Sequence, residues 1–157
     1  RDHVNRSTEG NSIFFFHMAQ PILKMKALPN LPGNIKANSQ SDTQVDIKLA
    51  LILVTSFIRL FAIREKLVSN NSMERAEELH KRSIISASTL EELCETFDFL
   101  TYLRIKIQAS SISRHEAPGN TFRLGQLSHI EALTLKKIQT NIASLQSSLG
   151  SVYSRGD

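Results

Sequence analysis

Glycine and cysteine are scarce in this chain of 157 residues, and each shortage excludes a class of chemistry. The six glycines never form a cluster, so the sequence lacks the glycine-rich loop that cradles phosphate groups in nucleotide-binding domains. The only cysteine, Cys94, has no partner for an internal disulfide, which is typical of a protein from a reducing compartment. Its neighbours Leu93 and Phe97 indicate a place in the core rather than a nucleophile. We therefore expect a cytoplasmic protein.

Residues that hold metals or act as acids and bases are not found in useful combinations. The five histidines lie far apart along the chain. The nearest approach to a ligand pair, His80 with Glu77 three residues before it, is better explained as a surface pair. Glu91, Glu92 and Glu95 lie near the expected start of a helix, where the helix dipole favours acidic residues. We expect neither a metal site nor a catalytic residue in this chain.

A membrane-spanning segment and a strong charge bias are missing as well. The uncharged run of the most apolar segment ends at Arg59 and is shorter than the ~20 residues that cross a bilayer. The segment IFFF at residues 13–16 is too short for the apolar region of a signal peptide. The net charge is +4, and the basic residues are scattered in ones and twos instead of forming a stripe. We expect neither a membrane nor nucleic acid as a partner. Because the sequence begins with Arg1 and not with Met, we expect it to be part of a longer protein.

What the sequence does contain is a helix-forming segment, residues 46–67, whose middle is apolar on almost every side. Aliphatic residues and phenylalanine fill most positions between Leu49 and Ile63, and charged residues stand at both ends. A helix that is apolar all round must be surrounded by protein or lipid. No strand pattern extends over more than a few residues. We therefore predict an all-α, antiparallel bundle of about five helices around this central helix.

Three capping boxes mark further helices of the bundle, because each pairs a capping side chain with a glutamate three residues later. The three pairs are Asn71 with Glu74, Ser88 with Glu91 and Ser128 with Glu131. The expected helices span residues 13–28, 71–82, 88–109 and 128–149. Pro21 should kink or split the first of these, and Gly150 should end the last. We expect a frayed lead-in at residues 1–10, one domain at 11–150 with loops at 29–43 and 110–123, and a tail at 151–157.

Two arginines interrupt the apolar faces of these helices. Arg59 lies within the central helix, and Arg104 lies on the apolar stripe of the helix expected at residues 88–109. A buried arginine must be paired, because an unpaired buried charge costs several kcal/mol. We favour pairing with internal carboxylates such as Asp46, Asp98 or Glu74. In the alternative, one or both arginines line a cleft and bind an anion.

Six short motifs, in this order along the chain, resemble the nucleotidyltransferase substrate-binding domain. They are DIK at 46–48, RLFA at 59–62, NSMER at 71–75, FDFLTYLRIKIQ at 97–108, PGN at 118–120 and LSHIEALTLK at 127–136. The resemblance covers residues 11–150. One departure is Ser56, because the family usually has an acidic residue three positions before the arginine that matches Arg59. If that acid contributes to binding, the site is altered in this chain.

In that family, the module follows a nucleotidyltransferase domain similar to that of PII-protein uridylyltransferases, in signal-transduction proteins of bacteria. The resemblance implies a helical bundle that helps to bind the acceptor substrate. It also implies that Mg²⁺ and a nucleoside triphosphate belong to an upstream catalytic domain, with no cofactor in this chain. The polar members of the motifs are the expected substrate-binding residues: Lys48, Arg59, Asn71, Arg75, Arg104, Gln108 and Asn120.

Two functions remain open at this point. The first is an accessory domain of an intracellular nucleotidyltransferase, which positions an acceptor for the upstream domain and does not itself catalyse the transfer. The second is a structural or regulatory bundle that docks or forms a homodimer within a signal-transduction protein. A catalytic domain upstream of Arg1 would favour the first function.

Overall fold

The computed structural model describes residues 12–29, 31 and 43–153. The expected lead-in, most of the loop at 29–43 and the last four residues of the tail lie outside these ranges. The described part contains five α-helices, one 3₁₀ helix and two short strands. In chain order they are α2 (Ser12–Lys24), β1 (Gln44–Asp46), α3 (Ile47–Arg64), α4 (Ser72–Lys81), α5 (Ala87–Ser113), β2 (Thr121–Arg123), η1 (Leu124–Gln126) and α6 (His129–Tyr153). The predicted all-α class is confirmed.

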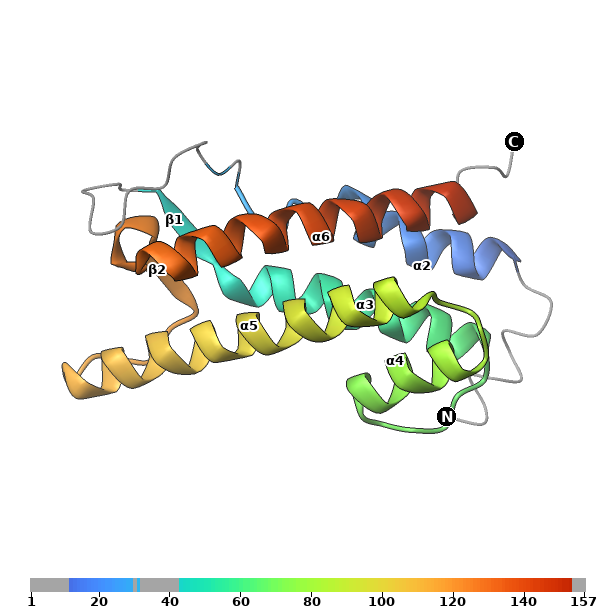
Figure 1. The fold of residues 1–157 in the computed structure, drawn as a ribbon, viewed down its shortest axis with the longest axis horizontal. Coiled ribbons are helices and arrows are strands. Elements are labelled where there is room, and N and C mark those ends of the chain that lie inside the picture. The colour runs from blue at the N-terminus through green and yellow to red at the C-terminus, as the bar shows by residue number, and fades with distance from the viewer. Residues whose placement is uncertain (1–11, 30, 32–42, 154–157) are drawn as a thin grey trace.

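Helix α3 lies at the centre and packs against each of the other four α-helices. In Figure 1, α5 crosses on one side of α3 and runs in the opposite direction, while α6 and α2 lie on the other side. The helix begins after Asp46, whose carboxylate accepts the backbone N–H of Lys48 at 2.9 Å, and it ends at Arg64. Phe57 is 2% exposed, but Leu49 is 41% exposed. The central position was predicted correctly, whereas one side of the helix is more open than an all-round apolar pattern suggests.

The starts of α4 and α6 were predicted correctly. Asn71 accepts the N–H groups of Met73 and Glu74 at 2.8 and 3.3 Å, so it caps α4 as expected. Ser128 and Glu131 form the complete reciprocal box at the start of α6, with N···O distances of 2.8 and 3.3 Å. Both caps are local interactions, and their signal lies within four residues of sequence.

Other helix ends were predicted wrongly. Helix α5 is capped by Ser86 and not by Ser88, since the Ser86 hydroxyl accepts the N–H of Thr89 at 3.1 Å. Helix α6 continues past Gly150, which lies beside Leu23 of α2: an added Cβ would make an ordinary van der Waals contact with Leu23 Cδ2 at 3.7 Å. Gly150 therefore does not end the helix, and the packing at this position does not require a glycine.

Helix α2 contains Pro21 without a break and ends at Lys24, four residues before the expected end. The amide of Gln146, on α6, donates to the carbonyl oxygens of Ile22 at 2.7 Å and Met25 at 2.9 Å. The Ile22 carbonyl belongs to the last turn of α2 and also accepts the N–H of Met25 at 3.4 Å, whereas the Met25 carbonyl lies just beyond the helix. A side chain from a neighbouring helix therefore helps to cap this end of α2.

The two strands were not predicted. Strands β1 and β2 pair in antiparallel fashion, with Val45 opposite Phe122, and both of these side chains are buried. Residues 110–123 were expected to form a loop, but α5 extends to Ser113 and β2 occupies residues 121–123. The strand pair therefore holds the start of α3 against the chain that follows α5. No helix in the described ranges is both long and apolar enough to span a membrane.

Candidate functional site

Three of the seven predicted substrate-binding residues have structural roles. Asn71 caps α4, as described above. Arg75 is 8% exposed, and its Nε donates to the carbonyl oxygen of Ser69 at 2.8 Å, which anchors the loop before α4. The carbonyl oxygen of Asn120 accepts the N–H of Ile47 at 3.0 Å. This last bond brings Asn120 next to the helix turn that carries Lys48.

The expectation that Arg59 and Arg104 are embedded in the core is wrong, because both are exposed. Arg104 directly follows Leu103, a fully buried residue, and consecutive residues of a helix point about 100° apart around its axis. The side chain therefore projects beside the buried stripe and not along it. Two of the carboxylates expected to pair with these arginines bind other groups. Asp46 caps α3, and Glu74 accepts a hydrogen bond from the hydroxyl of Ser69 at 2.6 Å.

The exposed cations among the seven are thus free for other contacts. Within the described part of the chain, the side chains of Lys48, Arg59 and Arg104 make no hydrogen bond or ion pair, and Gln108 is half-buried. No hydrogen bond in the described part of the chain joins the side chains of these four residues to one another. The Oδ1 atom of Asn120 is buried and has no hydrogen-bond partner there either.

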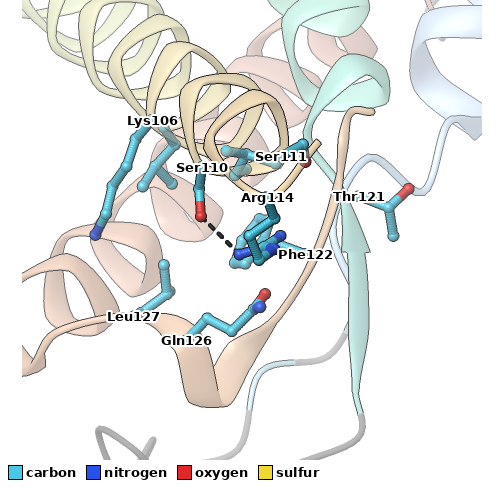
Figure 2. A pocket seen from close by; sticks show the side chains of 10 residues that line it. Lys106, Ser110, Ser111, Arg114, Thr121, Phe122, Gln126 and Leu127 are labelled. Carbon is cyan, nitrogen blue, oxygen red and sulfur yellow. Dashed lines mark hydrogen bonds between the residues drawn. The ribbon is translucent and has the colours of Figure 1, made fainter. Parts of the chain in front are cut away.

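A pocket of about 120 Å³ lies elsewhere, between the C-terminal end of α5 and the segment formed by β2 and η1 (Figure 2). Its lining is apolar at Leu103, Ile107, Phe122 and Leu127, and polar at Lys106, Ser110, Ser111, Arg114, Thr121 and Gln126. A cavity of ~150 Å³ accommodates benzene, whereas pockets for drug-sized ligands span ~300–1,000 Å³. This pocket therefore fits one ring or an end group and not a whole nucleotide.

Arg114 is the cation whose charged head lies within the pocket. Arg114 is the C-cap that follows the last residue of α5, and the next residue, His115, adopts a left-handed conformation with φ of 59° that turns the chain away from the helix. The Arg114 Nη1 donates to the hydroxyl of Ser110 at 2.7 Å, and its Nε and Nη2 lie 3.1 and 3.0 Å from one oxygen of Glu116. Figure 2 shows the guanidinium beside Phe122, with the amide of Gln126 below it. The Arg114 and Glu116 side chains are each about half exposed.

Lys106 contributes mainly its aliphatic stem, since Figure 2 shows its amine turned away from Arg114. That amine donates to both carboxylate oxygens of Glu131, on α6, at 2.5 and 2.7 Å. Glu131 also accepts the hydroxyl of Tyr102 at 2.9 Å and the N–H of Ser128. Burial raises the pKa of the Glu131 carboxyl, but the bonds from Lys106, Ser128 and Tyr102 outweigh it and lower the pKa to about 2. The network fixes the start of α6 to α5 along one edge of the pocket.

Two hydroxyl groups complete the polar lining. Ser111 is only 8% exposed, and its hydroxyl has no hydrogen-bond partner in the described part of the chain. The Thr121 hydroxyl, on the opposite wall, has none there either. Because the Ser111 hydroxyl opens onto the pocket, it is a group to which a bound molecule can hydrogen-bond.

The comparison with protein families decides what kind of domain carries this pocket. A family model described as "putative nucleotidyltransferase substrate binding domain" matches residues 12–153. The chain belongs to this family. No curated protein and no solved structure matches the chain significantly.

None of the lining residues of this substrate-binding domain was identified from the sequence. Lys106 lies in one of the matched motifs, but Ser110, Ser111 and Arg114 fell in an expected loop. The available signal was the spacing of Ser110 and Arg114, which are neighbours on a helix surface at i and i+4. That spacing carries meaning only once α5 is known to extend to Ser113.

Two other sequence expectations concern reactive groups in the substrate-binding domain. Cys94 is half-buried, and burial together with the charges of Asp98 and Glu77 raises the pKa of its thiol. A raised pKa lowers the thiolate fraction, which agrees with a structural role for Cys94. Among the residues in the described ranges, no three histidine, cysteine or acidic side chains form a group that could hold a metal ion.

Proposed function

We propose that this domain binds the acceptor of a nucleotidyltransferase and that the pocket at the end of α5 holds one end group of that acceptor. Membership of the substrate-binding family is the observation that carries the proposal. The pocket supports it, because it combines an apolar floor with a few convergent polar groups, the usual composition of a small-molecule site.

The size of the pocket limits what the domain does on its own. A volume of about 120 Å³ leaves no room for a nucleoside triphosphate beside the acceptor group. In this proposal, the nucleotide and Mg²⁺ bind to an upstream catalytic domain, and the bundle contributes rate by holding the acceptor in position. The exposed side chains of Lys48, Arg59 and Arg104 are candidates for contacts with the part of the acceptor outside the pocket.

The proposal can be tested with the intact protein, a labelled nucleoside triphosphate and a cell extract as the source of acceptor. Thr121→Trp places a large side chain at the rim of the pocket, at a strand position that tolerates aromatic residues. We expect this variant to require a higher concentration of extract for the same transfer rate, with unchanged dependence on nucleotide concentration. The matched control is Thr140→Trp, which makes the same change at an exposed residue of α6 outside the pocket lining.

Identical acceptor dependence in the two tryptophan variants would exclude the pocket as the acceptor site. Absence of nucleotidyl transfer by the intact protein would instead favour the second function, a structural or regulatory bundle.

A further inference from the structure

The ion pair of Arg114 with Glu116 is the feature of the pocket that identifies a ligand chemistry. The guanidinium presents Nε and Nη2 on one edge, and a single oxygen of Glu116 occupies both at 3.1 and 3.0 Å. An arginine fork can hold both oxygens of a carboxylate or phosphate in parallel, which is a stronger arrangement. The contact with Glu116 therefore leaves part of the capacity of Arg114 unused.

Another anion can replace Glu116 on Arg114 at little cost. Both side chains are about half exposed, and ion pairs exposed to water contribute little to stability. Glu116 lies beyond the end of α5 and does not line the pocket, so its carboxylate can move into water without disturbing the lining.

The end of a helix is ordinarily unfavourable for an anion, because the last carbonyl groups carry partial negative charge. Here the Glu116 carboxylate already occupies a position beside the last turn of α5. An anion that replaces this carboxylate on Arg114 adds no further negative charge to the site. The serine hydroxyls of the last turn, Ser110 and Ser111, can donate to it.

We propose that the end group bound in this pocket carries a carboxylate or phosphate, which displaces Glu116 from Arg114 while its carbon skeleton rests on Phe122 and Leu127. This inference rests on the proposed function and specifies the chemistry of the acceptor. Glu116 acts as an internal substitute for the ligand anion and keeps Arg114 paired when the pocket is empty.

The test uses two anions of suitable size, benzoate and phenyl phosphate, and the uncharged benzyl alcohol, titrated calorimetrically into the chain at low salt. We expect both anions to bind more tightly than the alcohol and to weaken as salt is added. The tighter of the two identifies the natural group as a carboxylate or a phosphate.

Three variants locate the binding. Glu116→Gln should tighten anion binding by about two- to fivefold, because it removes a competing carboxylate. Arg114→Met should weaken it by at least about tenfold. The matched control is Arg82→Met, which breaks another surface arginine–glutamate pair, with Glu78 on α4, outside the pocket. It should leave anion binding unchanged.

Anions that bind no better than benzyl alcohol to both the wild type and Glu116→Gln would overturn the inference. A gain of affinity in Glu116→Gln cannot arise from misfolding, so this variant keeps the test decisive even if Arg114→Met folds poorly. If Thr121→Trp impairs transfer in the intact protein but Arg114→Met does not, the acceptor binds in this pocket but its end group carries no carboxylate or phosphate. That outcome would retain the proposed function and overturn this inference. If the anions bind but Thr121→Trp transfers normally, the anion site is retained and its role in acceptor binding is refuted.

Discussion

Among single residues, Glu131 shows how a buried charge can be stabilised by several donors at once. Its carboxylate accepts bonds from Lys106, Tyr102 and the backbone of Ser128, while its own N–H completes the capping box. One carboxyl group thereby joins α5 to the first turn of α6. The hydrogen bond from Tyr102 to Glu131 raises the pKa of the Tyr102 hydroxyl, since a carboxylate accepts a hydrogen bond from the phenol but repels the phenolate.

We predict that Glu131 makes the domain sensitive to acid. Its pKa is about 2 in the folded chain and ordinarily 4.5, so the unfolded chain binds a proton at higher pH than the folded chain does. This stabilisation is complete above about pH 4.5 and is lost as the pH falls towards 2, with a size on the order of 3 kcal/mol. Urea unfolding between pH 6 and pH 2.5 should show a steeper loss of stability in the wild type than in Glu131→Gln. Parallel pH dependence in the two proteins would contradict the prediction.

The exposure of an individual arginine was harder to predict than the helix that carries it. Arg104 is one position away from the buried Leu103, and a shift of about 100° around the helix axis separates a core position from the surface. Its assignment to the apolar stripe was therefore wrong, although the helix that carries it was correct. Among the described residues, the buried arginine is Arg75, and the carbonyl group it binds lies in an irregular loop that periodicity does not describe.

Among the elements, helix α3 depends on burial more than on any other interaction. Half of its residues are buried, including Phe57, whose ring lies 5.0 Å from that of Phe61. Residues with a β-branch or an aromatic ring are only moderate helix formers, so packing against the surrounding helices stabilises this segment.

We predict that Phe57→Ala lowers the free energy of unfolding by about 3–5 kcal/mol, because it leaves a large cavity inside the bundle. Leu49→Ala, on the same helix, should cost about 1 kcal/mol or less, since that side chain is 41% exposed. Chemical denaturation of both variants provides the measurement. Equal costs would mean that α3 is not covered in the way the structure shows.

The elements also show why part of the candidate site could not be predicted. The caps at Asn71 and Ser128 are encoded within four residues and were found. Strands β1 and β2 have only three residues each, too few for an alternating pattern, and each is defined by a partner far along the chain. Because Thr121 and Phe122 belong to β2, the pocket could not be located without that pairing.

For the molecule as a whole, the proposed function gives the bundle a surface and a pocket and leaves the chemistry of transfer to another domain. We predict that the purified chain incorporates no labelled nucleotide in the presence of Mg²⁺. Nucleotidyl transfer that depends on Mg²⁺ needs carboxylates placed around the metal ion. The described residues contain no group of three or more histidine, cysteine or acidic side chains that could hold one. Incorporation that a chelator abolishes would show that this prediction is wrong.

The pairing of β1 with β2 also has a consequence for the order in which the molecule assembles. It joins two segments separated by the whole of α3, α4 and α5, so it closes the chain over a long sequence distance. Such a closure costs entropy that is recovered only after the intervening helices have come together, and contacts of this kind form slowly. We therefore expect the wall of the pocket to form late in folding and to open early when the chain unfolds locally. A ligand that bridges α5 and β2 would slow this opening, and hydrogen exchange at the backbone amides of the strand pair would report it.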